Sequence, residues 1–110
     1  MKIKNDFVTN SSSTSFIITN KTNEVRTLLD FAKENLSLVG DFNDMYDEKI
    51  DYDEFLKSVS ENNVDWNPKE EMKISFGDED GTIVGRVYDY ILRDGGESLS
   101  FTWRFDEYYR

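Results

Sequence analysis

The sequence predicts a single α+β domain over residues 1–110, with about three strands and two or three helices packed on one face of the sheet. Apolar and polar residues alternate in residues 72–76 and 99–105, which is typical of half-buried strands. Apolar residues recur every three or four positions in residues 23–38 and 51–61, which is typical of helices. Aromatic residues make up 15% of the chain and offset its modest apolar content, because each can bury a large area.

The first half of the chain is expected to form one strand, one helix and one loop. Residues 15–19 are short, apolar and β-branched, and therefore predict a strand. Residues 23–38 predict a helix, with Thr22 as its N-cap and Gly40 as its terminator. Residues 41–49 are expected to form a loop.

The middle of the chain predicts a second helix and a second strand. The helix should begin at Asp51, because Asp51 and Glu54 are spaced like the two partners of a capping box. It should end near residues 61–63, before a turn at residues 66–68. The strand is expected over residues 72–76.

The last third of the chain is expected to begin with an acidic turn at residues 77–81. Residues 82–93 could form a helix or a strand. The spacing of their apolar residues favours a helix capped by Thr82, whereas the β-branched content at the start is compatible with a strand. Residues 94–96 should stop this element. The clearest strand follows, and its alternation places four apolar side chains in the core: Leu99, Phe101, Trp103 and Phe105.

The composition excludes several chemistries. The chain has no Cys and no His, so disulfides, thiolate nucleophiles, Cys/His zinc sites and histidine bases are excluded. Its glycines match neither a phosphate-binding loop nor a dinucleotide fingerprint, and we expect no cofactor and no metal site. The sequence names no catalytic residue, and an enzyme is the less favoured reading.

The net charge of −10 bears on the kind of partner. Nucleic acids and anionic membranes bind basic surfaces, so we expect no direct contact with either, whereas a basic protein surface would suit this chain. No apolar stretch approaches the roughly 20 residues that span a bilayer. The polar start lacks a secretory signal, and the expected location is the cytoplasm. The sequence does not set the oligomeric state.

A run of small polar residues at positions 9–15 is the first candidate site. Its hydroxyl groups could bind a phosphate or carboxylate or be phosphorylated, and the candidates are Ser11, Ser12 and Ser13. The alternative is a hydrogen-bonded turn that leads into the first strand. Nucleophilic use would need an activating base, and no spacing in the sequence suggests one.

This run also carries a resemblance. Residues 2–17 (KIKNDFVTNSSSTSFI) resemble an N-terminal signature shared by small uncharacterised proteins of bacteria and phages. In that signature a basic start is followed by a Phe-Val-Thr-Asn-Ser-Ser-Ser-like run and then an aromatic and aliphatic pair. Thr14 stands where another serine is usual. The resemblance implies a bacterial or phage setting, and it implies no activity.

An acidic segment, residues 41–54, is the second candidate site. It holds one base, Lys49, and seven acids. Residues 50–56 resemble the second half of a calcium-binding EF-hand loop, but Met45 and Glu48 stand where such a loop needs a ligand and a glycine. The alternatives are a solvated helix start and a docking surface for a basic partner. The acids are Asp41, Asp44, Asp47, Glu48, Asp51, Asp53 and Glu54.

The aromatic end of the chain is the third candidate. Tyr108 and Tyr109 lie beside Arg110, and tyrosine and arginine are typical interface anchors. The edges of a small sheet can also pair with a partner chain.

Together these features predict a small non-catalytic module of bacterial or phage origin that binds or regulates a protein through its acidic segment. One alternative is an acidic mimic of nucleic acid that inhibits a defence or DNA-binding enzyme. A second alternative is a carboxylate- or metal-dependent enzyme, or a virion or assembly component.

Overall fold

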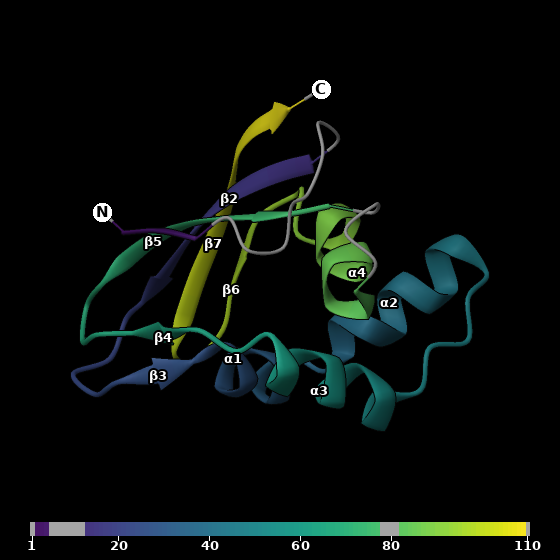
Figure 1. Ribbon diagram of the computed structural model, residues 1–110, viewed down its shortest axis with the longest axis horizontal. Coiled ribbons are helices and arrows are strands. Elements are labelled where there is room, and N and C mark those ends of the chain that lie inside the picture. Colours follow the sequence, from purple (N-terminus) through teal and green to yellow (C-terminus); the bar gives the residue numbers. More distant parts are fainter. Residues whose placement is uncertain (1, 5–12, 78–81, 110) are drawn as a thin grey trace.

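The computed structural model describes residues 2–4, 13–77 and 82–109 of the chain (Figure 1). These residues form a five-stranded sheet, a two-stranded sheet and four helices. This confirms the α+β class, and the numbers of both strands and helices exceed those expected. Several predicted features lie outside what the structure describes. They are Ser11 and Ser12, residues 78–81 of the acidic turn expected at 77–81, the side chain of Tyr109, and Arg110.

The larger sheet is built around two long antiparallel strands, β2 (Ser13–Asn20) and β7 (Phe101–Tyr109). Strand β5 (Glu71–Phe76) pairs antiparallel with the other side of β2, and β1 (Lys2–Lys4) runs parallel to β5 at the edge. The short strand β6 (Gly96–Glu97) forms the opposite edge beside β7. The three predicted strands are therefore the central strands β5, β2 and β7, and the edge strands β1 and β6 were not predicted.

The smaller sheet pairs β3 (Arg26–Thr27) with β4 (Asp65–Trp66). Trp66 is fully buried, and its indole Nε1 donates a hydrogen bond of 2.9 Å to the carbonyl oxygen of Ile18 in β2. This bond satisfies a polar group that burial would otherwise leave unpaired, and it ties the two sheets together.

The helix expected over residues 23–38 is confirmed only for residues 28–34, and its predicted start and length are wrong. Helix α1 (Leu28–Glu34) has Thr27 as its N-cap, and Thr27 forms a capping box with Asp30. Thr22, the expected cap, instead donates its hydroxyl to the side chain of Asn20 in a turn. The capping box satisfies the free amides of Thr27 and Asp30, so the helix starts directly after Thr27.

Helix α2 (Ser37–Tyr46) lies where a terminator at Gly40 and a loop from residue 41 were expected, and that prediction is wrong. Val39 is fully buried and Phe42 is 2% exposed, so two large apolar side chains in this helix reach the core. Their burial outweighs the low helix propensity of Gly40, because each buried side chain contributes about 1.5–3 kcal/mol and a helical glycine costs about 1 kcal/mol.

The remaining two helices confirm their predictions. Helix α3 (Tyr52–Glu61) is capped by Asp51, whose side chain accepts hydrogen bonds from the amides of Asp53 and Glu54. Helix α4 (Ile83–Ile91) is capped by Thr82, whose hydroxyl accepts from the amide of Gly85 at 2.9 Å. The open choice for residues 82–93 is thus resolved as a helix.

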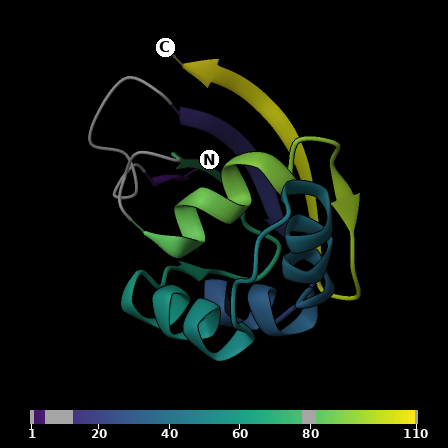
Figure 2. The ribbon, with the colours of Figure 1, turned by 90° about the vertical axis from the view of Figure 1, so that its right-hand side faces the viewer.

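The helices gather on one side of the sheet, along the concave side of β2 and β7 (Figure 2). Phe31 of α1 lies at the centre of this layer, with its ring 5.1–5.5 Å from those of Tyr88, Phe101 and Trp103. These edge-to-face pairs match the geometry that aromatic rings prefer. The aromatic residues thus supply much of the core, as their abundance predicted.

Two residues expected in the core are exposed. Leu99 is 88% exposed because it precedes β7, which begins at Phe101, and so it does not share the strand's alternation. Phe105 is 45% exposed, although its ring packs 6.5 Å from that of Phe16. It lies beyond Trp103, the last β7 residue paired with β6, so that neighbour does not cover it.

Candidate functional site

The acidic segment divides into two parts that lie on different helices. Asp51, Asp53 and Glu54 lie at the start of α3, where Asp51 caps the helix and the other two occupy its first turn. A helix N-terminus carries a partial positive charge, so carboxylates stabilise it. For these three residues the local structure explains the charge.

The other part has the opposite arrangement. Helix α2 has no acid in its first turn, whereas Asp44 lies in its last turn and Asp47 is its C-cap, with a left-handed φ of 52°. A helix C-terminus carries a partial negative charge, and an acid there typically costs about 0.3–1 kcal/mol. Asp41 adds a third carboxylate to the same helix. All three residues are exposed, and no cationic side chain in the described part of the chain pairs with them.

Glu48 differs from these three acids because it forms an ion pair with Arg86 of α4. The guanidinium of Arg86 also lies 6.0 Å from the ring centroid of Phe42. Glu48 therefore helps to fix the segment after α2 against α4 and is already neutralised.

The likeness of residues 43–54 to a calcium loop is not reproduced in three dimensions. Asn43 and Met45, the first and third positions of such a loop, lie within α2. The side chain of Asn43 is occupied by the backbone of Ile50, to which it donates at 3.1 Å and from which it accepts at 2.9 Å. Within the described residues no group of three or more acidic side chains is placed to hold a metal ion.

A groove of about 280 Å³ lies between α2 and the C-terminal end of α4. Asp41 and Asp44 contribute to its lining. Sequence reasoning missed the groove because residues 41–49 were expected to form a loop, and because Ile91 and Asp94 come from a distant part of the chain. Three apolar residues and one further aspartate complete it: Leu38, Met45, Ile91 and Asp94. Met45 is 64% exposed, so the groove presents apolar surface beside its carboxylates.

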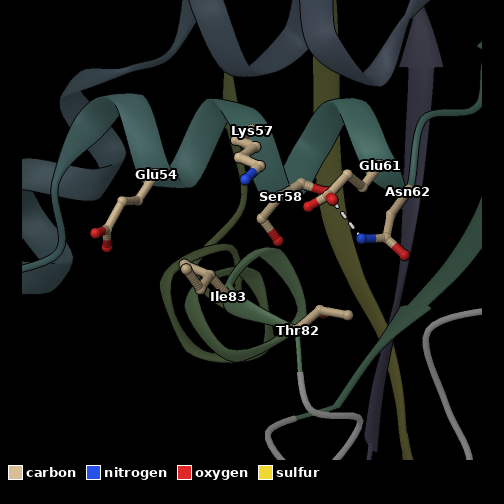
Figure 3. Close-up of a pocket in the computed structure, with 7 residues that line it drawn as sticks. All are labelled: Glu54, Lys57, Ser58, Glu61, Asn62, Thr82 and Ile83. Atoms are coloured by element: carbon tan, nitrogen blue, oxygen red, sulfur yellow. Dashed lines mark hydrogen bonds between the residues drawn. The ribbon is translucent and has the colours of Figure 1, made fainter.

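A second pocket, of about 410 Å³, lies between α3 and the start of α4 (Figure 3). Its central polar groups serve the packing of the two helices. The hydroxyl of Ser58 accepts from the amide of Val84 at 3.2 Å, and Asn62 donates to the carbonyl oxygen of Ser58 at 2.8 Å. Three further side chains extend from α3 along this pocket, as Figure 3 shows, and all three are exposed: Glu54, Lys57 and Glu61.

The described end of the polar run is built into the sheet. Ser13 is 2% exposed, and Thr14 and Ser15 are fully buried in β2. Thr14 donates its hydroxyl to Asp89 of α4 at 2.6 Å, and Arg93 donates to both Thr14 and Asp89. Sequence reasoning did not single out Asp89 or Arg93, since a lone charged pair at helical spacing is usually a solvated one.

On the opposite face of β2, Ser15 donates to Asp106 at 2.8 Å. The strand pairing shifts register at this point, and Lys73 of β5 lies 3.2 Å from the same carboxylate oxygen of Asp106. The hydrogen bond from Ser15, and then the charge of Lys73, hold the pKa of the Asp106 carboxyl below its ordinary value despite partial burial. These contacts are those of a satisfied structural cluster around a buried hydroxyl.

The aromatic end of the chain extends β7 to Tyr109. Tyr108 is 43% exposed, and the guanidinium of Arg93 lies 5.4 Å from its ring centroid and 4.7 Å from that of Tyr90. Cation–π contacts of this kind attach the end of β7 to α4.

Comparison of the chain with protein-family models, with characterised proteins and with solved structures found no match. The N-terminal resemblance therefore stays a prediction. The helices of the described residues include none that is long and apolar enough to cross a membrane.

Proposed function

We propose that this chain is a non-catalytic binding module that docks a basic surface of a partner protein. The docking surface is the α2 acidic face, defined as Asp41, Asp44 and Asp47. The observation that supports it is the placement of unpaired carboxylates at the C-terminal end of α2, where the helix dipole disfavours them: Asp44 lies in the last turn and Asp47 is the C-cap.

Solubility alone does not account for this placement. Surface acids that serve solubility act equally well at many positions, and those at the start of α3 also stabilise their helix. Two acids of the α2 acidic face, Asp44 and Asp47, instead oppose the dipole of the helix that carries them. Natural proteins keep such local conflicts mainly at functional sites, where another interaction compensates for them.

A basic partner would supply that compensation. Its lysine or arginine residues would neutralise the three exposed carboxylates and the negative end of the helix at once. The attraction would speed association and would weaken as salt rises, because exposed charges are screened beyond about 8–10 Å at physiological ionic strength.

The test is affinity capture from bacterial lysate with the immobilised full chain, followed by mass spectrometry. The first variant is the triple Asp41→Asn, Asp44→Asn and Asp47→Asn. The matched control removes the same number of charges from exposed acids elsewhere: Asp53→Asn, Glu61→Gln and Glu71→Gln.

We expect a partner that the wild type and the control variant both retain, that the α2 variant loses, and that elutes with rising salt. Equal capture by all three chains would remove the α2 acidic face from the mechanism. The absence of any reproducible partner would contradict the proposal as a whole.

A further inference from the structure

The groove between α2 and α4 combines exposed apolar surface with carboxylates. One side chain in it, Met45, is 64% exposed, and the apolar residues Leu38 and Ile91 lie partly exposed beside it. Three aspartates line the same groove: Asp41, Asp44 and Asp94. Its occupant should therefore bring apolar atoms and positive charge together.

The charge of the groove is not balanced within the described chain. No cationic side chain there pairs with Asp41, Asp44 or Asp94. The groove also lies beside two helix C-termini, because Met45 is in the last turn of α2 and Ile91 ends α4. Both helix ends add partial negative charge from their carbonyl groups.

The volume of the groove and the separation of its carboxylates limit which kind of cation it could bind. Its volume of about 280 Å³ is at or below the roughly 300–1,000 Å³ of pockets that enclose small molecules, so one large side chain fits it better than a cofactor. The described acids form no cluster that could hold a metal ion, which leaves a cation broad enough to reach separate carboxylates.

We propose, on the basis of the function proposed above, that this groove binds an arginine side chain on an amphipathic segment of the partner protein. The methylene stem would lie against Leu38, Met45 and Ile91. The planar guanidinium has five donors and is weakly hydrated, so it can divide its hydrogen bonds among three aspartates while its stem is buried. Lysine carries a compact, strongly hydrated charge and would bind this surface less well.

The probe is an alanine-rich helical peptide of about 16 residues with blocked termini. Its leucine and arginine residues are spaced three or four positions from one another, so that they lie on one face of the helix. Two further peptides replace every arginine with lysine or with the uncharged analogue citrulline. Titration of the full ¹⁵N-labelled chain by NMR measures affinity and identifies the amides that shift. We expect the shifts to centre on Leu38, Asp44 and Ile91, with citrulline weakening binding at least roughly tenfold.

Two double variants test the groove itself. Met45→Ser with Asp94→Asn removes one exposed apolar side chain and one charge from the groove. The control, Tyr52→Ser with Asp53→Asn, makes the same two changes on the exposed start of α3, where Tyr52 is 43% exposed. All four positions are exposed, so both variants should keep the wild-type NMR dispersion.

We expect the groove variant to lose most of its affinity for the arginine peptide and the control to keep it. Equal binding of the lysine peptide, equal losses in both variants, or shifts centred elsewhere would each overturn the groove proposal. Its failure is separable from that of the proposed function. One separating outcome is a captured partner that the triple variant of Asp41, Asp44 and Asp47 loses but that Met45→Ser with Asp94→Asn retains. That result would support the acidic face as the docking surface and contradict the groove.

Discussion

Thr14 donates its hydroxyl to the Asp89 carboxylate at 2.6 Å, and this bond joins β2 to α4 across 75 positions of the sequence. Both residues are buried, with exposed fractions of 0% and 3%. The bond anchors the end of the polar run beneath the helix layer. A hydroxyl that the composition offered as a ligand-binding group therefore has a defined structural partner.

Replacing Thr14 with Val should lower the free energy of unfolding by about 1–3 kcal/mol, because it removes a donor from a buried carboxylate at nearly constant volume. Urea denaturation followed by circular dichroism measures this change. Thr102→Val is the control, since the Thr102 side chain is only partly buried and should change stability by less than about 0.5 kcal/mol. Equal effects in the two variants would contradict the importance of the Thr14–Asp89 bond.

Removing a different hydroxyl, that of Tyr88, should not lower the free energy of unfolding. The Tyr88 hydroxyl is buried without a hydrogen-bond partner, and burial raises its pKa far above the ordinary value. Tyr88→Phe should therefore leave the protein equally stable or stabilise it by up to about 1–3 kcal/mol. A lower urea midpoint in this variant would show that the hydroxyl has a partner in solution.

The pairing of Ser15 with Asp106 predicts a pH dependence. The pKa of Asp106 lies below its unfolded value of about 3.9, so its ionised form stabilises the fold above that pH, and this contribution is lost as the pH falls through the folded pKa. Ser15→Ala should raise the pKa of Asp106, as measured by carboxylate NMR titration. Asp106→Asn should make stability fall less steeply below about pH 4. Ser13→Ala, on the same strand, should leave the pKa of Asp106 in place.

The cap of α3 predicts a contrast between two acids on one helix. Asp51→Ala should cost about 0.5–2 kcal/mol, because two amides lose the side chain that accepts from them. Glu61 lies at the other end of the helix, and Glu61→Ala should be neutral or slightly stabilising. Urea midpoints of the two variants measure the difference, and a larger loss from Glu61→Ala would contradict the capping role.

The acids of α2 should show the stability cost on which the proposed function depends. Asp44→Asn together with Asp47→Asn should raise the free energy of unfolding by about 0.5–1 kcal/mol, since two negative charges leave the helix C-terminus. Asp53→Asn, at the start of α3, should lower it slightly. Stabilisation should shrink in high salt, where the charge effects are screened. Destabilisation by the α2 variant would remove the argument that these acids are kept for binding.

Elements with local signals were predictable from sequence. Asp51 and Thr82 cap their helices within three residues of the amides that they bind, so a short window contains the evidence. The alternation around Ile74 likewise predicts β5, because a strand exposes its two faces in turn. The sequence also identified the acidic segment. It did not show that some of its acids lie at the end of α2, where the helix dipole disfavours them, and others at the start of α3, where it favours them.

Tertiary contacts decided the elements that were mispredicted. Gly40 lies inside α2 because the burial of Val39 and Phe42 outweighs its low helix propensity. Phe105 keeps the alternation of its strand but lies past the reach of β6, so its exposure depends on where a neighbouring strand ends.

By itself the sequence determined the fold class, three central strands, two capped helices and the exclusion of thiol and imidazole chemistry, because each depends on residue type or on spacing along a few positions. Only the tertiary structure decided that Asp89 meets Thr14 and that Asp94 and Ile91 join Asp44 at one groove. The physical reason is that contacts between residues far apart in the sequence depend on how separate helices and strands pack. Packing balances burial over the whole core, and no short stretch of sequence contains that balance.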